Sequence, residues 1–210
     1  MSILHKLQWR YAVRKFDQTK NVSEEQITEL LKATNLSASA LGLQPYEFII
    51  IHDKELQKEL QGYSRDQVQI GGASHLIVFA TKTEISEDYV LEYIARTEKI
   101  RGFEPGGMDD YKKLIFEVAA SKTKEDIFHW TQKQAYLALG TLLVAAADLQ
   151  IDVCPIELIN AEKYNKALGL DEQNLHACVV ATVGYRSLED TLHTKPKSRR
   201  HLDDITQLRY

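Results

Sequence analysis

The feature that most constrains the fold is an almost entirely apolar run from Ala135 to Ala147, flanked by Gln134 and Asp148. A helix is predicted over residues 127–149. Its second half is apolar on nearly every side, so several other elements must pack against it. The run is shorter than the roughly 18 apolar residues that a membrane-spanning helix needs. The sequence therefore predicts a buried core helix and no membrane span.

Helix and strand patterns alternate along the rest of the chain, without an internal repeat or a break in composition. Ser23 and Gln26 have the spacing of a capping box, ahead of a helix that runs to about Thr34. This organisation predicts a single domain over residues 1–210. Strands are predicted over 46–52, 75–81, 152–155 and 177–183, and further helices over 53–60, from 88, and over 161–168, the last ended by Gly169.

The segment from Arg101 to Lys124 shows little periodicity. It contains Pro105-Gly106-Gly107 and three aromatic residues, Phe103, Tyr111 and Phe116. Glycine and proline interrupt regular structure, and long loops in a compact domain often carry function. We therefore expect a mobile excursion at this place, in the position of a substrate lid.

Overall charge and cysteine usage limit the partners and the compartment. The 26 Lys+Arg and 30 Asp+Glu give a formal net charge of −4, so neither nucleic acid nor an anionic membrane is expected as a partner. Cys154 and Cys178 lack CxxC spacing and are predicted to be buried free thiols. The first residues, up to Lys6, lack the apolar stretch of a signal peptide. We expect a cytoplasmic protein.

Two local concentrations of cations contrast with the negative net charge. The segment 9–16 holds Arg10, Arg14 and Lys15 among aromatic residues, and the segment 195–200 holds four cations and no acid. Taken alone, each is more typical of a solvated surface. However, like charges three or four residues apart on a helix repel, unless an anion lies between them. The alternative is that the two segments meet and donate charge-assisted hydrogen bonds to a phosphate.

Together with a third segment, these two resemble the nitroreductase family of FMN enzymes. That family has a basic Arg-x-x-x-Arg/Lys-x-Phe start, a Gln-Pro-aromatic-x-Phe strand and a Lys-Ser-Arg end. Residues 10–16, 44–48 and 197–199 match these motifs in the same order. The resemblance covers nearly the whole chain, with further matching segments at 66–69, 73–75, 130–136, 155–157 and 183–185.

The resemblance implies a fold class and an assembly. The expected fold is α+β, with three layers, α-β-α, around a mostly antiparallel central sheet. The expected assembly is an intertwined two-fold homodimer with FMN at the subunit interface. The helix over 127–149 would then gain a second neighbour in the dimer.

The resemblance also assigns residues to the cofactor. Arg10, Lys197 and Arg199 would bind the FMN phosphate, while Arg14 and Gln69 would face the pyrimidine end of the ring. Reduction leaves negative charge near the ring N1 and O2, so a fixed cation such as Arg14 would raise the flavin potential.

Further cofactor contacts are implied around the ring. Asp66 would approach its polar edge, and the backbone of residues 156–158 would lie beside N5. Ser39 would reach across from the partner subunit. The complete implied set adds Tyr11, Ala12, Gln134, Pro155, Ile156, Glu157 and Leu158.

Three residues depart from the family pattern. Tyr11 stands where relatives often have histidine, and Ala12, where they often have serine, removes a possible hydrogen bond to the phosphate. Leu158 stands where some members have glycine, so a loop that depends on positive φ would cost more here. These departures leave open a non-catalytic flavin-binding or partner-binding module.

The implied activity is that of an NAD(P)H-dependent flavin oxidoreductase. Hydride would pass from NADH or NADPH through flavin N5 to a nitroaromatic or quinone acceptor in a ping-pong cycle, with no side chain as an obligatory acid or base. Relatives could instead use the flavin for dehalogenation, flavin fragmentation or reduction of an activated alkene. No motif distinguishes NADH from NADPH. The expected substrate pocket consists of Phe103, Tyr111, Phe116 and Phe128.

Competing chemistries lack support in the sequence. The seven histidines show no His-Glu-x-x-His spacing, so no metal site is predicted and His75 is interpreted as structural. Gly71-Gly72 is not a GxGxxG motif, and Gly-x-Ser-x-Gly is absent. The reactivity is therefore expected to come from the flavin.

Overall fold

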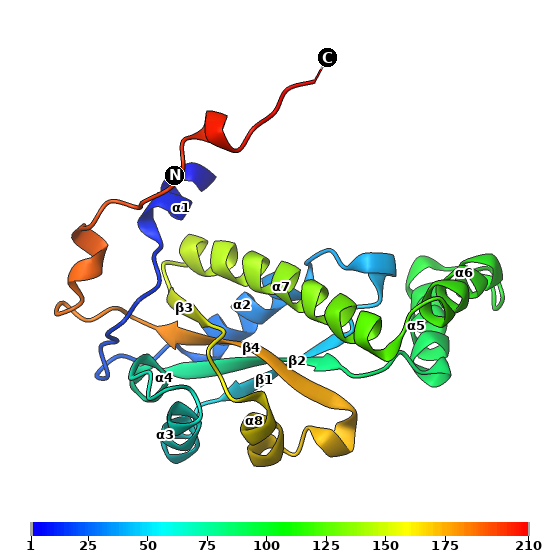
Figure 1. Cartoon of the computed structure of the whole chain (residues 1–210), viewed down its shortest axis with the longest axis horizontal. Coiled ribbons are helices and arrows are strands. Elements are labelled where there is room, and N and C mark those ends of the chain that lie inside the picture. The colour runs from blue at the N-terminus through cyan, green and yellow to red at the C-terminus, as the bar shows by residue number, and fades with distance from the viewer. Residues whose placement is uncertain (1, 210) are drawn as a thin grey trace.

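The computed structural model describes residues 2–209 and builds them around a four-stranded sheet in the order β1-β2-β4-β3 (Figure 1). All three strand pairs are antiparallel, and β2 is displaced against β4 by an irregularity between Phe79 and Ala80. The two central strands are covered on both faces, which explains why they are continuously apolar. The strands are β1 Tyr46–Ile51, β2 His75–Lys82, β3 Asp152–Ile156 and β4 Leu175–Gly184.

Helices cover both faces of the sheet (Figure 1). On one face, α2 (Glu24–Asn35) packs beside α7 (Lys124–Asp148). On the other face lie α3 (Lys54–Gly62), α4 (Gln69–Gly72) and α8 (Ala161–Leu168). This arrangement confirms the predicted α+β class with three layers and an antiparallel sheet.

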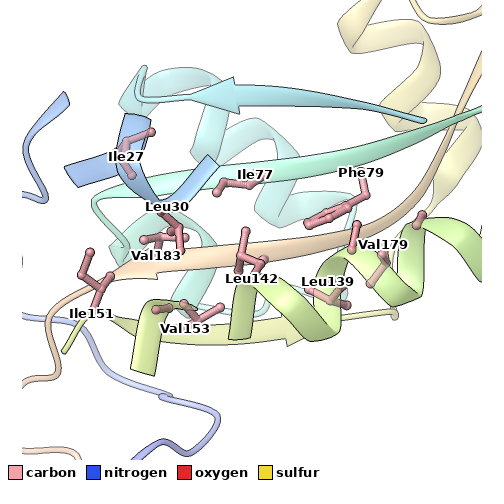
Figure 2. Close-up of a cluster of buried hydrophobic side chains, with 14 of the residues drawn as sticks. Ile27, Leu30, Ile77, Phe79, Leu139, Leu142, Ile151, Val153, Val179 and Val183 are labelled. Carbon is pink, nitrogen blue, oxygen red and sulfur yellow. The ribbon is translucent and has the colours of Figure 1, made fainter. Parts of the chain in front are cut away.

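The helix α7 is the spine that the apolar run predicts. Figure 2 shows Leu139 and Leu142 of α7 lying against Phe79 and Val179 of the central strands. Each such buried side chain contributes roughly 1.5–3 kcal/mol relative to exposure. The helix begins three residues earlier than predicted, because Thr123 caps it through reciprocal hydrogen bonds with Asp126.

The excursion between the second strand and α7 is more regular than the sequence suggests. It contains α5 (Glu87–Arg101), which ends at Gly102 in the left-handed region, and α6 (Asp109–Ala120). The Glu98 carboxylate accepts hydrogen bonds from the backbone N–H groups of Gly106 and Met108, at 3.1 and 3.0 Å. The expectation of an irregular segment is therefore wrong for α6, because this tertiary contact fixes the turn before it.

The N-terminal helix α1 lies beside the segment that follows β4, at the end of the molecule opposite α5 and α6 (Figure 1). Lys197 donates a hydrogen bond of 2.6 Å to the carbonyl of Gln8, at the end of α1. Within residues 2–209, no helix has both the length and the hydropathy of a membrane span. The remaining short elements are α1 Ile3–Trp9 and the 3₁₀ turns η1 Ala40–Gly42, η2 Asp171–Gln173, η3 Thr191–Thr194 and η4 Leu202–Asp204.

Candidate functional site

The two basic segments of the sequence meet around one cavity, which we call the basic cavity. It has a volume of about 290 Å³, and none of its described lining residues is acidic. Both segments contribute to its wall, as the sequence predicts for a shared anion site. The lining residues are Arg10, Tyr11, Ala12, Arg14, Leu192, Lys195, Pro196, Lys197 and Arg199.

The cations of this cavity destabilise one another. Burial, and then the charge of Arg199, lowers the pKa of Arg10. Burial also lowers the pKa of Lys197, and the charges of Arg10 and Arg199 add to that effect. A bound anion would relieve this repulsion, so the cavity has the donor set and the charge of a phosphate site.

The first basic segment is held in place by Arg186. Its guanidinium forms a forked ion pair with the buried Asp152, with N–O distances of 2.6 and 2.9 Å. It also lies over the rings of Trp9 and Tyr11, 4.3 and 4.6 Å from their centroids. These contacts fasten the end of α1 to the edge of the sheet, where Ala12 is bridged to β3.

Asp190 fixes the backbone beside Arg14. Its carboxylate accepts hydrogen bonds from the N–H groups of Arg14 and Lys15, at 2.7 and 3.1 Å. Burial opposes the ionisation of Asp190, but these bonds and one from Leu192 outweigh it and lower its pKa. The Arg14 backbone is thus anchored from the opposite end of the chain.

A second cavity, the apolar cavity, shares Arg14 with the basic one. Its volume is about 430 Å³, and it lies between α7 and the end of β3. Because Arg14 lines both, the two cavities are neighbours. The apolar cavity is lined by Arg14, Gln67, Tyr136, Leu139, Gly140, Leu143, Pro155, Ile156, Glu157, Leu158 and Val179.

One hydrogen bond crosses the mouth of the apolar cavity. The Tyr136 hydroxyl donates to the Glu157 carboxylate at 2.6 Å. Burial and this bond raise the pKa of Tyr136, so the phenol stays protonated and donating. Beneath Arg14, burial raises the pKa of the Cys154 thiol, which keeps it inert at neutral pH. Cys154 is buried and Cys178 is half-buried, and both are free.

The loop that carries Leu158 needs no left-handed backbone at that residue. The residues with positive φ nearby are Arg65 and Asp66, at 53° and 54°, in the turn before α4. The next residue, Gln67, lines the apolar cavity. The buried Gln69 donates a hydrogen bond of 3.1 Å to the side-chain oxygen of Gln67. The backbone at Leu158 is therefore not strained. Gln69 does not line the apolar cavity itself but contacts the lining residue Gln67.

Two further predicted residues, Ser39 and Gln134, lie next to one another elsewhere. The Ser39 hydroxyl accepts the N–H of Gln44 at 3.0 Å, and Gln134 accepts the N–H of Ala40 at 2.8 Å. In the part of the chain that the structure describes, neither lines the basic or the apolar cavity. Their hydrogen bonds connect η1 to the N-terminal half of α7.

The four aromatic residues predicted for a substrate pocket also lie outside both cavities, as far as the described residues show. Phe116 lines a separate cavity of about 480 Å³ near the start of α7, and Tyr111 donates to the Leu41 carbonyl at 3.1 Å. Phe128 packs edge-on against His176, and Phe103 is half exposed. One chain alone does not assemble these residues around the apolar cavity.

Several lining residues were not predicted from the sequence. Tyr136, Leu139, Gly140 and Leu143 are spaced i, i+3, i+4, i+7, the pattern of one helix face, and that spacing could have identified them. Lys195 lies within the second basic segment but was not assigned to the anion. Gln67 gave no such signal, because its direction depends on the turn at Arg65 and Asp66.

Comparison with known proteins agrees with this architecture. The model of the nitroreductase family matches residues 7–185. A Staphylococcus epidermidis protein named "putative NAD(P)H nitroreductase" is 33% identical over 97% of this chain and 95% of its own. A Bacillus subtilis structure described as a putative nitroreductase has a TM-score of 0.87 at 17% identity, covering 98% of both chains. A structure from Exiguobacterium sibiricum, described as a putative nitroreductase in complex with FMN, has a TM-score of 0.85 at 19% identity and covers 100% and 98%.

Proposed function

The chain belongs to the nitroreductase family, and on that premise we propose that it is an FMN-dependent oxidoreductase that uses NADH or NADPH to reduce nitroaromatic or quinone acceptors. When bound, FMN supplies the chemistry, because its ring accepts hydride from the donor and releases it to the acceptor in a ping-pong cycle. The residues around the cavities have three tasks, which are to bind the phosphate, to orient the ring and to exclude water.

The observation that carries this proposal is that a basic and an apolar cavity are neighbours, with Arg14 in the lining of both. FMN has the same division, since a phosphate ester is joined through a short chain to a flat and largely apolar ring. The names of the relatives support it, because one states NAD(P)H nitroreductase and one structure contains FMN.

The cations of the basic cavity would bind the phosphate of FMN. Arg10, Lys197 and Arg199 approach it from both chain ends, and each hydrogen bond to a charged group contributes about 1.5–3 kcal/mol. Ala12 offers no hydroxyl, so the guanidinium and ammonium groups must supply the side-chain donors. Burial and neighbouring cations lower the pKa values of Arg10 and Lys197, so a bound anion would stabilise their charged forms.

The apolar cavity would bind the isoalloxazine ring of FMN. Leu139, Leu143 and Ile156 provide walls that exclude water, and Arg14 places a positive charge at the end shared with the phosphate site. A cation there stabilises negative charge on the reduced ring, and more strongly when water is excluded. Arg14 is exposed in a single chain, so its full effect requires a cover over the cavity.

We propose that a second copy of the chain supplies this cover in a two-fold homodimer. Large apolar side chains are exposed on the elements around the site: Ile3 and Leu4 of α1, Leu137 of α7, and Ile205 in the C-terminal segment. A dimer interface would remove such exposed apolar side chains from water. In such a dimer, Ser39 and the aromatic residues of the partner could complete the site that one chain leaves open.

A cytoplasmic location is part of the proposal. NADH and NADPH are intracellular electron donors. The two cysteines are free thiols, and this state suits a reducing compartment.

A matched pair of variants tests the phosphate site. Arg199 lines the basic cavity, whereas the adjacent Arg200 donates to the Asp204 carbonyl instead. R199Q should weaken FMN binding by about 10- to 100-fold, the loss of one charged hydrogen bond, and R200Q should leave it unchanged. Fluorescence titration of the apoprotein with FMN measures both. Equal effects of the two variants, or none from R199Q, would contradict the proposed site.

A further inference from the structure

A cluster of three potential metal ligands lies outside both cavities. Glu24 begins α2, His52 directly follows β1 and His75 begins β2. One ligand atom from each lies within 4.8 Å of the other two. Among residues 2–209 this is the only such trio of histidine, cysteine or acidic side chains. Sequence spacing does not reveal it, because whole elements separate the three residues.

The buried histidine of this cluster has an unused ring nitrogen. The side chain of His75 is 1% exposed, and its Nε2 makes no hydrogen bond within the described residues, although the Glu24 Oε1 atom lies 3.5 Å from it. The other nitrogen, Nδ1, is 2.9 Å from the Ser74 hydroxyl, which also accepts the N–H of Val22. If Nδ1 donates to this hydroxyl, the lone pair of Nε2 points into the cluster. Metal-binding histidines are commonly fixed by such a hydrogen bond from the other ring nitrogen.

The distances from Glu24 to the two histidines suit a small tetrahedral site, and the two histidine atoms lie within 4.8 Å of one another. The Glu24 Oε1 atom lies 3.5 Å from His75 Nε2 and 3.8 Å from His52 Nδ1. Zinc bonds of about 2.0–2.1 Å place neighbouring tetrahedral ligands roughly 3.3–3.4 Å apart. Glu24 and His52 are both exposed, so small rotations of their side chains can close the difference. A solvent molecule would occupy the fourth position.

We propose that Glu24, His52 and His75 bind a divalent transition-metal cation of the zinc type. Two imidazoles and one carboxylate favour Zn²⁺ over Mg²⁺ and Ca²⁺, which prefer sets of oxygen ligands. The nearest competing cation is Lys54, whose ammonium is already bound to the carbonyl oxygens of Ala73 and Ser74. The metal would join the start of α2 to the two adjacent strand ends, a structural role separate from the flavin reaction.

The test is isothermal titration of the full-length protein, carrying its FMN, with Zn²⁺. The wild-type chain should bind one Zn²⁺. E24Q and H52A should each weaken binding by roughly 100-fold, since even loss of an outer hydrogen bond to a ligand costs about 10- to 100-fold. Both positions are exposed, so these variants should fold, and they should keep their FMN and their NAD(P)H oxidation rate.

Two control variants distinguish this site from adventitious binding. E25Q removes the next acid in the same helix turn, and H129A removes a histidine 3.8 Å from the Glu125 carboxylate that has no third ligand. Both should bind Zn²⁺ as the wild type does. As a second readout, Co²⁺ should give the intense visible bands of a tetrahedral complex in wild type and not in H52A. Absence of Zn²⁺ binding in the wild type, or equal loss in H129A and H52A, would overturn the proposal.

Discussion

The two halves of α7 have different surroundings. The C-terminal half, from Tyr136 to Leu143, borders the apolar cavity, which Arg14 joins to the basic cavity. The N-terminal half, around Gln134, packs against η1 and the α5–α6 excursion. One region therefore provides, within a single chain, the two cavities that we propose for the phosphate and the ring. The other carries Ser39 and the aromatic residues expected in the substrate pocket, which lie outside both cavities among the described residues and which we propose to be contributed by a second chain.

The largest expected effect comes from a substitution that disrupts the proposed dimer interface on α7. Leu137 is 52% exposed on α7, and L137D would place a charge where the second copy should bury apolar surface. We expect dimerisation to weaken by at least about 100-fold, because burying a charge without a partner is costly, and FMN content to fall with it. Sedimentation equilibrium and flavin absorbance measure the two effects.

The control is L188D, at a leucine that is 99% exposed in the segment after β4. This variant should remain dimeric and flavin-bound. A dimeric L137D protein with normal FMN content would show that α7 does not form the interface.

The second effect tests the backbone of Arg14, the residue that lines both cavities of a single chain. D190N weakens the acceptor for the N–H groups of Arg14 and Lys15 and should lower the free energy of unfolding by about 1–3 kcal/mol at pH 7. Because the folded pKa of Asp190 is lowered, its contribution is complete above the unfolded pKa of about 3.9, and is lost as the pH falls through the folded value. The difference between D190N and wild type should therefore shrink below about pH 4.

Urea unfolding across pH measures this contribution. E189Q is the control, because Glu189 is exposed and makes only a 3.3 Å surface contact with Lys15. A pH-independent difference between D190N and wild type would mean that the ionised carboxylate is not what anchors Arg14.

A smaller effect concerns the residue that the two cavities share. R14Q should retain FMN, because Arg10, Lys197 and Arg199 remain, but should make the flavin potential more negative. We expect a shift of roughly 20 mV, or about 1 kcal/mol for a two-electron couple, since Arg14 is exposed in one chain and its charge is partly screened. Spectroelectrochemistry measures the shift, with K15Q as the control. An unchanged potential would remove Arg14 from the tuning role.

The smallest expected effect measures how much Ser39, beside the N-terminal half of α7, contributes to FMN binding. S39A removes a hydroxyl that already accepts the Gln44 N–H within its own chain, so FMN affinity should fall by only about two- to fivefold. Titration of the dimer with FMN measures this. An effect as large as that of R199Q would place Ser39 among the main phosphate or ring contacts.

Local patterns in the sequence predicted most of the elements. The helix over 161–168 is found as α8, and Gly169 adopts the left-handed conformation that ends it. The capping box at Ser23 is also present. These features depend on neighbours in sequence, so they are visible without the fold. The helix α6 was harder to predict, because the turn before it is fixed by the hydrogen bonds of Glu98 with Gly106 and Met108.

The residues of the basic cavity were easier to predict from the sequence than those of the apolar cavity. The two basic segments line the basic cavity, and it was their order with the other family motifs, more than their charge alone, that predicted a shared anion site. Gln67 and Tyr136 were missed, because which side chains face a cavity is decided by packing. The Glu24, His52 and His75 cluster was missed for the same reason, since three separate elements bring it together.

The central claim is that the basic and apolar cavities together bind FMN, and the visible absorbance of the purified protein tests it most directly. The account predicts a flavin spectrum, either on purification or after incubation with FMN, at about one FMN per chain. Addition of NADH or NADPH under anaerobic conditions should bleach that spectrum. A colourless protein that takes up no FMN would contradict the account, and a bound flavin that neither donor bleaches would leave a flavin-binding module without the proposed activity.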